Sequence, residues 1–256
     1  MPYSFTGSGA IVISSNQTVN NVWPFSVSCW LMASTRGSAE SSAIAGILFK
    51  AGSGNTFVGV VAMNLFVNVI TGSNFGTIRY AYGTTAGATV LARETTRGTI
   101  ETGRWTHVCA THLSGSITAT DVKIYINGTE NAVYGVSQNG VGKLGRDDLC
   151  NLYIGNVNSF VRANSGWIEE IAWWNAVLTQ DEVTLLNSSR TKHIPLMIQP
   201  SNLIGYFSMN EFPDNRQGVL GDSIVDMSPN RFVGLLTNGL GGAMPIGLAE
   251  QVLSYP

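Results

Sequence analysis

Two neighbouring glutamates, Glu169 and Glu170, stand among three tryptophans in residues 166–186, GWIEEIAWWNAVLTQDEVTLL. Two carboxylates that face one space can hydrolyse a glycosidic bond, one as the acid and the other as nucleophile or base. The alternating pattern predicts a strand, and adjacent residues of an unbroken strand point to opposite faces of the sheet. We therefore expect the two acids not to form a catalytic pair. Glu170 would be bonded internally, and Glu169 would be solvated or paired with an arginine.

Trp167 and Trp173 in the same stretch are candidates for contact with a glycan or a protein partner, because an exposed ring beside polar groups can stack on a ligand. Tyr80 and Tyr82 are two further candidates. The alternative is that these rings fill the core, as large aromatic side chains usually do. Both interpretations remain open at this point.

Acidic and amide side chains form two candidate calcium sites, since calcium takes several oxygen ligands from neighbouring loops. The first candidate is Asp147, Asp148 and Asn151. The second is Glu211, Asp214, Asp222 and Asp226. Neither group has the spacing of an EF-hand, and Asp226 followed by Ser228 and Asn230 is also typical of an Asx turn. Calcium is the one cofactor that the sequence suggests.

The histidines do not suggest a catalytic or metal centre. His107 and His112 are five apart on one predicted strand and would face opposite sides, and His193 stands alone. The sequence also contains no Ser-His-Asp or Cys-His motif and no glycine loop of the phosphate-binding kind. No catalytic residue is predicted.

The elements that would position these residues are mostly strands. Residues 25–32 alternate between apolar and polar positions, which is the period of a half-buried strand. Asn127-Gly128 between two apolar runs predicts a type I′ hairpin whose second strand is 133–136. Thr179 followed by Glu182 forms a capping box at the start of one short helix, with Val183 and Leu186 on its apolar side. Strand parity in residues 166–174 predicts one buried row, Ile168, Glu170, Ala172 and Trp174.

Composition limits the partners. The chain has 256 residues, 12% of them charged, and a formal net charge of −2, so it has no basic field that would recruit nucleic acid or an anionic membrane. Its three cysteines, Cys29, Cys109 and Cys150, are an odd number and do not suggest a disulfide framework. The first residues lack the basic and apolar regions of a signal peptide. We expect a protein made in a reducing compartment.

Four segments, taken in order, resemble the laminin G-like, concanavalin A-like jelly-roll family. They are Phe5-Thr-Gly-Ser-Gly with Phe25-Ser-Val-Ser-Cys-Trp; Trp105-Thr-His-Val-Cys-Ala with Val122-Lys-Ile-Tyr-Ile-Asn-Gly; Leu152-Tyr-Ile-Gly with Gly166-Trp-Ile-Glu-Glu-Ile-Ala-Trp-Trp-Asn; and Gly205-Tyr-Phe-Ser-Met-Asn-Glu with Asp226-Met-Ser-Pro-Asn. The resemblance implies an all-β, two-sheet antiparallel jelly-roll sandwich with one short helix. Members of this fold that hydrolyse glycans carry E-x-D-x-x-E on one strand, which this sequence lacks. The fold itself hosts many functions.

The domain prediction is one sandwich over residues 1–234 and an apolar, glycine-rich tail over 235–256 that could dock on a neighbouring subunit. Such a tail would expose large apolar side chains if it were left in water. The predicted docking residues are Leu240, Met244, Ile246, Leu248, Leu253 and Tyr255. A homo-oligomer is therefore expected.

Three functional hypotheses follow. The first is a non-catalytic binding or assembly module, a bacteriophage virion protein such as a capsid decoration or fibre-associated subunit, made in the host cytoplasm with capsid or tail subunits as partners. It rests on the low charge, the unpaired thiols and the apolar tail. The second is a calcium-assisted, lectin-like carbohydrate-binding module, which would be extracellular. The third is a glycoside hydrolase, and the missing carboxylate pair speaks against it.

Overall fold

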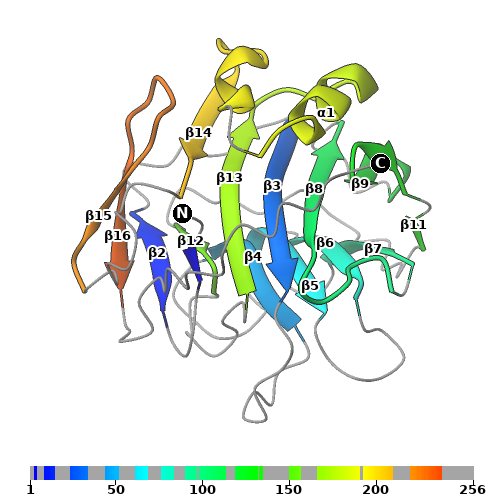
Figure 1. Ribbon diagram of the computed structural model, residues 1–256, viewed down its shortest axis with the longest axis horizontal. Helices are drawn as coiled ribbons and strands as arrows, with labels where there is room; N and C mark the ends of the chain where they lie inside the picture. Colours follow the sequence, from blue (N-terminus) through cyan, green and yellow to red (C-terminus); the bar gives the residue numbers. More distant parts are fainter. Residues whose placement is uncertain are drawn as a thin grey trace.

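The computed structural model describes residues 3–4, 9–14, 24–33, 44–51, 61–68, 76–83, 90–96, 98–113, 119–131, 133–134, 150–156, 166–190, 193–209 and 220–237. Most of these residues lie in strands, which form two antiparallel sheets packed face to face (Figure 1). The expected all-β sandwich with one short α-helix is confirmed for the described part of the chain.

Sheet A, at the front of Figure 1, has the strand order β1-β13-β3-β8-β9-β10, and β14 also pairs with β13. Its strands are β1 (Tyr3–Ser4), β3 (Phe25–Ala33), β8 (Trp105–His112), β9 (Val122–Ile126), β10 (Thr129–Glu130), β13 (Gly166–Trp174) and β14 (Leu203–Phe207). A short 3₁₀ turn, η1 (Ala119–Asp121), leads into β9. The long central strands β13, β3 and β8 therefore lie side by side and present one continuous outer face.

Sheet B lies behind sheet A in the order β11-β7-β6-β5-β4-β12-β2-β16-β15. Its strands are β2 (Ala10–Ile13), β4 (Ile44–Ala51), β5 (Val61–Asn68), β6 (Ile78–Gly83), β7 (Val90–Thr95), β11 (Val133–Tyr134), β12 (Asn151–Ile154), β15 (Ser223–Val225) and β16 (Val233–Thr237). The two sheets enclose the main core.

That core contains the inward rows of both sheets. In β3 the side chains of Val27, Cys29 and Leu31 point inward, as the alternation of residues 25–32 predicts. Burial raises the pKa of the Cys29 thiol to about 12, so this cysteine is an inert, reduced core residue. Cys109 is a second buried thiol, which agrees with the expectation that the chain has no disulfide framework.

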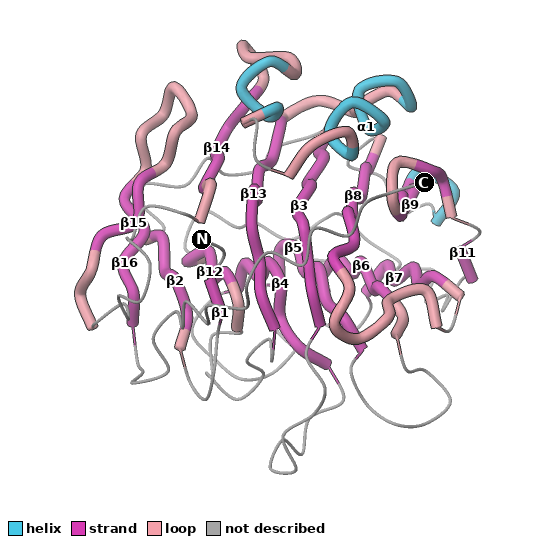
Figure 2. The backbone as a smooth tube through the Cα atoms, viewed as in Figure 1, coloured by secondary structure: helices cyan, strands magenta, loops and turns pink. Residues whose placement is uncertain are grey.

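Helix α1 (Gln180–Asn187) and the 3₁₀ helix η2 (Ile194–Met197) cover one end of the outer face of sheet A (Figure 2). The predicted capping box is present, because Thr179 Oγ1 accepts from the Glu182 N–H and Glu182 Oε2 accepts from the Thr179 N–H. Val183 and Leu186 are buried as predicted. They belong to a second apolar cluster, outside the sandwich, that includes Trp174 and Tyr206.

The hairpin prediction is half right. Asn127 and Gly128 have φ values of 49° and 79°, which fits the predicted type I′ turn. The partner strand is β10, however, and not residues 133–136. Val133–Tyr134 forms β11 and pairs with β7 in the other sheet. The chain therefore crosses between the sheets after Glu130.

The predicted boundary between sandwich and tail also needs a correction. Strand β16 continues to Thr237, and its inward Leu236 contributes to the main core. Residues 235–237 thus belong to sheet B, because they pair with β2. The predicted docking residues 240–255 lie outside the described residues, so the docking tail stays a prediction.

Candidate functional site

Strand β13 contains a β-bulge at the two glutamates. Glu169 lies opposite Trp30 of β3, but the next matched pair is Ala172 with Ser28, so β13 carries one extra residue. Glu170 is that irregular position, with φ of 52°. Ile168 and Ile171 are three apart, yet both point into the main core. The predicted row of Ile168, Glu170, Ala172 and Trp174 is therefore wrong, because the bulge reverses the parity of the strand.

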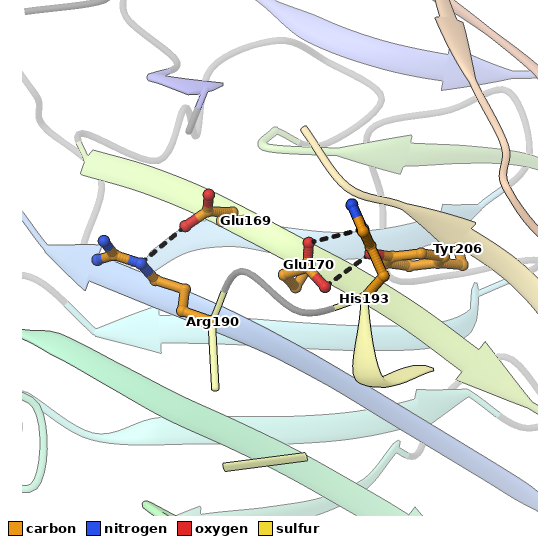
Figure 3. A network of polar contacts seen from close by, with 5 residues as sticks. All are labelled: Glu169, Glu170, Arg190, His193 and Tyr206. Carbon is orange, nitrogen blue, oxygen red and sulfur yellow. Dashed lines mark hydrogen bonds and ion pairs between the residues drawn. The ribbon is translucent and has the colours of Figure 1, made fainter. Parts of the chain in front are cut away.

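The bulge also brings both carboxylates to residues that follow α1 on the outer face of sheet A (Figure 3). Glu169 Oε2 lies 3.0 Å from Arg190 Nε. Glu170 Oε2 accepts a hydrogen bond of 2.6 Å from the Tyr206 hydroxyl, and its Oε1 lies 3.6 Å from His193 Nδ1. The expectation of an internally bonded Glu170 and an arginine-paired Glu169 is confirmed. The expectation that the acids face opposite ways is wrong.

The bond directions around Tyr206 follow from its single hydroxyl proton. That proton goes to Glu170, so the hydroxyl must accept from His193 Nδ1, which is 2.6 Å away. The Nδ1 of His193 therefore carries a hydrogen. Glu170, Tyr206 and His193 form one chain of hydrogen bonds that joins the bulge to the start of η2.

Both carboxylates are nearly inaccessible, with exposed residue fractions of 4% for Glu169 and 3% for Glu170. Burial raises the pKa of Glu169 to about 7, although Arg190 and the amino terminus of the chain act in the opposite direction. The ion pair with Arg190 also lacks hydrogen-bond geometry in the described structure. Glu169 is thus a desolvated acid whose charge is only partly compensated.

Beyond the helices, the outer face of sheet A carries aromatic side chains on three adjacent strands. Trp105 of β8 and Trp167 of β13 both lie opposite Met32 of β3, so the three form one row. Trp30 lies two residues before Met32 on the central strand β3, so it occupies the next row and is a diagonal neighbour of both Trp105 and Trp167. All four side chains are half-buried. We call Trp30, Met32, Trp105 and Trp167 the tryptophan face.

Polar groups border the tryptophan face. The guanidinium of Arg190 lies over the Trp105 ring, 4.2 Å from its centroid, while it also contacts Glu169. The ring of Trp30 is tilted against His107, with centroids 5.3 Å apart. His107 Nε2 lies 2.8 Å from Ser28 Oγ, and burial lowers the pKa of His107 to about 3. The imidazole is therefore neutral, whereas Glu169 and Arg190 are charged groups beside the rings.

Comparison with known proteins agrees with this architecture. The family model described as the concanavalin A-like lectin/glucanases superfamily matches residues 5–184, well over half of the chain. The chain belongs to this superfamily. A search of curated protein sequences found no match.

Two solved structures share the superfamily sandwich. One, from Bacteroides ovatus, is provisionally described as a carbohydrate-binding protein; it has 16% identity and a TM-score of 0.56, over 93% of this chain and 59% of that one. The other is a heptameric SAP-like pentraxin from Limulus polyphemus, with 16% identity and a TM-score of 0.51, over 93% of this chain and 94% of that one. This chain thus spans less than two thirds of the Bacteroides protein. At such identities the likeness shows the fold.

The predicted aromatic contacts divide into three outcomes. Trp167 is half-buried on the tryptophan face, where it could meet a ligand. Trp173 and Tyr80 are core residues, which contradicts the prediction: Trp173 stacks on Phe207 at 5.8 Å, and the Tyr80 hydroxyl lies 3.2 Å from His112 Nδ1 of the opposite sheet. The side chain of Tyr82 lies outside the described residues. Trp173 turned inward because of the bulge.

Trp30, Trp105 and Arg190 are site residues that were not predicted from the sequence. The first two carry a readable signal, since strand alternation puts Trp30 opposite in direction to the core residues Val27 and Leu31. The same alternation separates Trp105 from the inward Val108. Arg190 carries no such signal, because only the path of the chain after α1 brings it to the sheet.

The candidate calcium ligands are mostly outside the described residues. Asp147 and Asp148 are outside the described residues, whereas Asn151 is half-buried in β12. Of the second group, Asp226 accepts from the backbone N–H groups of Tyr206, Ser228 and Phe232, which confirms the Asx turn. Within the described residues, no three His, Cys, Asp or Glu side chains could hold a metal together. Calcium binding stays a prediction.

The remaining predictions concern the location, the protein partners and the oligomeric state of the chain. No helix among the described residues is long and apolar enough to cross a membrane. A virion location and capsid or tail partners stay predictions, because neither related structure is a virion protein. The Limulus pentraxin is heptameric, and a homo-oligomer of the present chain likewise stays a prediction.

Proposed function

We propose that this chain is a non-catalytic carbohydrate-binding module and that it binds glycans on the tryptophan face. The observation that carries the proposal is the position of Trp30 and Trp167, two half-buried indoles that are diagonal neighbours on adjacent strands. Ligand sites combine such aromatic surfaces with a few fixed polar groups. Polar side chains border the rings here, with Arg190 over Trp105 and His107 against Trp30.

Two further observations support a binding role. The chain belongs to a superfamily of lectins and glucanases, and the Bacteroides protein of the same fold is provisionally described as carbohydrate-binding. Glu169 and Glu170 are nearly buried and bonded to Arg190 and Tyr206, so neither is presented to a substrate. A hydrolase needs an acid and a second carboxylate at the scissile bond. Binding without hydrolysis therefore fits the site best.

Screening of the protein on a broad glycan array, followed by calorimetry with the best oligosaccharide, tests the proposal. The Trp167→Ala variant should lose roughly tenfold or more in affinity, because truncation of a central tryptophan usually removes a large part of the binding energy. Val225→Ala is the matched control, since Val225 is an exposed apolar residue of sheet B. Its affinity should equal that of the wild type.

Three results would contradict the proposal: no binding to any glycan, equal affinity of Trp167→Ala and wild type, or release of reducing sugar from a bound glycan. Chelation with EDTA tests separately whether binding needs calcium. Loss of binding after chelation would indicate a calcium-dependent site, for which residues 147–148 are the candidates, in place of the tryptophan face. Binding that survives chelation supports the tryptophan face.

A further inference from the structure

Arg190 covers a ring that belongs to the tryptophan face. Its guanidinium carbon is 4.2 Å from the centroid of Trp105, so one face of that indole is occupied. Trp105 shares a row with Trp167, the two lying on either side of Met32. Strands in a sheet are about 4.8 Å apart, so the two indoles are held at roughly twice that spacing. A ligand on Trp167 that extends along the row meets Arg190 before it meets Trp105.

We propose that Trp105 is a third ligand-stacking residue and that Arg190 is a removable cap on it, held in place by Glu169. The proposal rests on the proposed function for its ligand, which is an extended oligosaccharide that spans the row from Trp167 to Trp105. The capped surface offers Trp30 and Trp167. The uncapped surface offers all three indoles.

The contacts of Arg190 make such a release feasible. Its side chain is 34% exposed, whereas its partner carboxylate on Glu169 is only 6% exposed. The contact between them is an ion pair without hydrogen-bond geometry, so its strength depends on the charge of Glu169. Once that charge is lost, the cation–π contact alone must offset the rotamer entropy of a long, well-hydrated side chain. Arg190 should then spend much of its time in solvent.

Acid is one means of removing that charge. Burial raises the pKa of Glu169 to about 7, so mild acidification protonates it. Among the residues that the structure describes, the titratable groups nearest Glu169 on this face are His107 on β8, Glu170 on β13 and His193 after α1. The positive charge of the amino terminus lowers the pKa of Glu169. His107 stays neutral because burial lowers its pKa to about 3. Glu170 accepts a hydrogen bond from the Tyr206 hydroxyl.

Acrylamide quenching of tryptophan fluorescence tests the cap without any ligand. The quenching of Trp105 is obtained by subtraction: the quenched fluorescence of each protein's Trp105→Phe counterpart is subtracted from that of the protein itself. We expect that difference to be quenched roughly twofold more strongly at about pH 5 than at about pH 8 in the wild type. Glu169→Gln, which mimics the protonated acid, should show the strongly quenched value at both pH values. Arg190→Gln should do the same.

Arg104→Gln is the matched control, because Arg104 precedes Trp105 and pairs with the exposed Glu101. It should behave as the wild type does. The pH comparison in the wild-type background needs only the Trp105→Phe substitution, so it decides the question even if Glu169→Gln or Arg190→Gln fails to fold. Equal quenching of Trp105 at the two pH values would overturn the cap.

Oligosaccharide titrations of the same proteins separate this inference from the proposed function. Arg190→Gln should bind the best array oligosaccharide at least about threefold more tightly than the wild type, since a further indole becomes available. Weaker binding by Arg190→Gln would make Arg190 a ligand contact and would also overturn the cap. If the quenching of Trp105 changes with pH as expected, but neither the wild type nor any variant binds a glycan, then the cap is supported and the carbohydrate-binding function is refuted.

Discussion

The Tyr206 hydroxyl donates a hydrogen bond of 2.6 Å to Glu170 Oε2. This bond ties β14 to the bulge of β13, and the same hydroxyl lies 2.6 Å from His193 Nδ1 at the start of η2. Glu170 and His193 both have left-handed backbone conformations, with φ values of 52° and 50°. Such conformations persist where the surroundings determine them strongly. Tyr206 thus bonds to two residues with strained backbones, one in β13 and one at the start of η2.

Replacement of Tyr206 by phenylalanine should lower the free energy of unfolding by about 2 kcal/mol, because it leaves a buried carboxylate oxygen without its donor. Urea denaturation followed by fluorescence measures the change. The same substitution in a Glu170→Ala background, which removes the acceptor, completes a double-mutant cycle. The two changes should be clearly non-additive. Additivity would show that the 2.6 Å bond contributes nothing to stability.

The buried Glu169 should make the protein less stable as the pH rises from about 4.5 to about 7. Its pKa is raised in the folded state, so over this range the folded protein binds more protons than the unfolded chain, and stability falls as they are lost. A shift of this size corresponds to about 3 kcal/mol. The difference in unfolding free energy between wild type and Glu169→Gln, measured at several pH values, isolates the effect. A difference that does not vary with pH would contradict it.

His107 should have the opposite effect. Burial lowers its pKa from 6.5 to about 3, so between these values the unfolded chain binds the additional proton and the folded protein loses stability on acidification. The expected loss is about 5 kcal/mol across the full range. His107→Gln, which can still bond to Ser28, should remove this part of the pH dependence. If the variant and the wild type lose equal stability in acid, then another group is responsible.

The sandwich could be predicted from the sequence because its signals are local. The alternation of residues 25–32 gave β3, and Thr179 with Glu182 gave the start of α1. Asn127-Gly128 gave the turn but not the partner strand, since the short β10 and the crossing to sheet B depend on tertiary pairing. Local patterns specify turns and caps better than they specify which strand a segment joins.

The candidate site was harder to predict because one extra residue reversed its geometry. The bulge at Glu170 moved Trp173 into the core and placed both glutamates near the segment after α1. A bulge is not visible as a break in the pattern GWIEEIAWW, because apolar residues stand at both parities. Arg190 reaches Trp105 across a sequence separation that no periodicity describes. Sequence alone therefore identified Trp167 but not the surface around it.

The packing of Trp173 on Gly205 tests the corrected position of this tryptophan in the core. Gly205 lies opposite Trp173, and a Cβ added to it would meet Trp173 Cζ2 within van der Waals overlap, while the same ring stacks on Phe207. Gly205→Ala should therefore cost about 1–3 kcal/mol of unfolding free energy, as overpacking of a dense core does. In a Trp173→Leu background, where the ring is absent, the same change should cost much less. Chemical denaturation of the four proteins gives the cycle, and an equal cost in both backgrounds would mean that the Trp173 ring does not lie on Gly205.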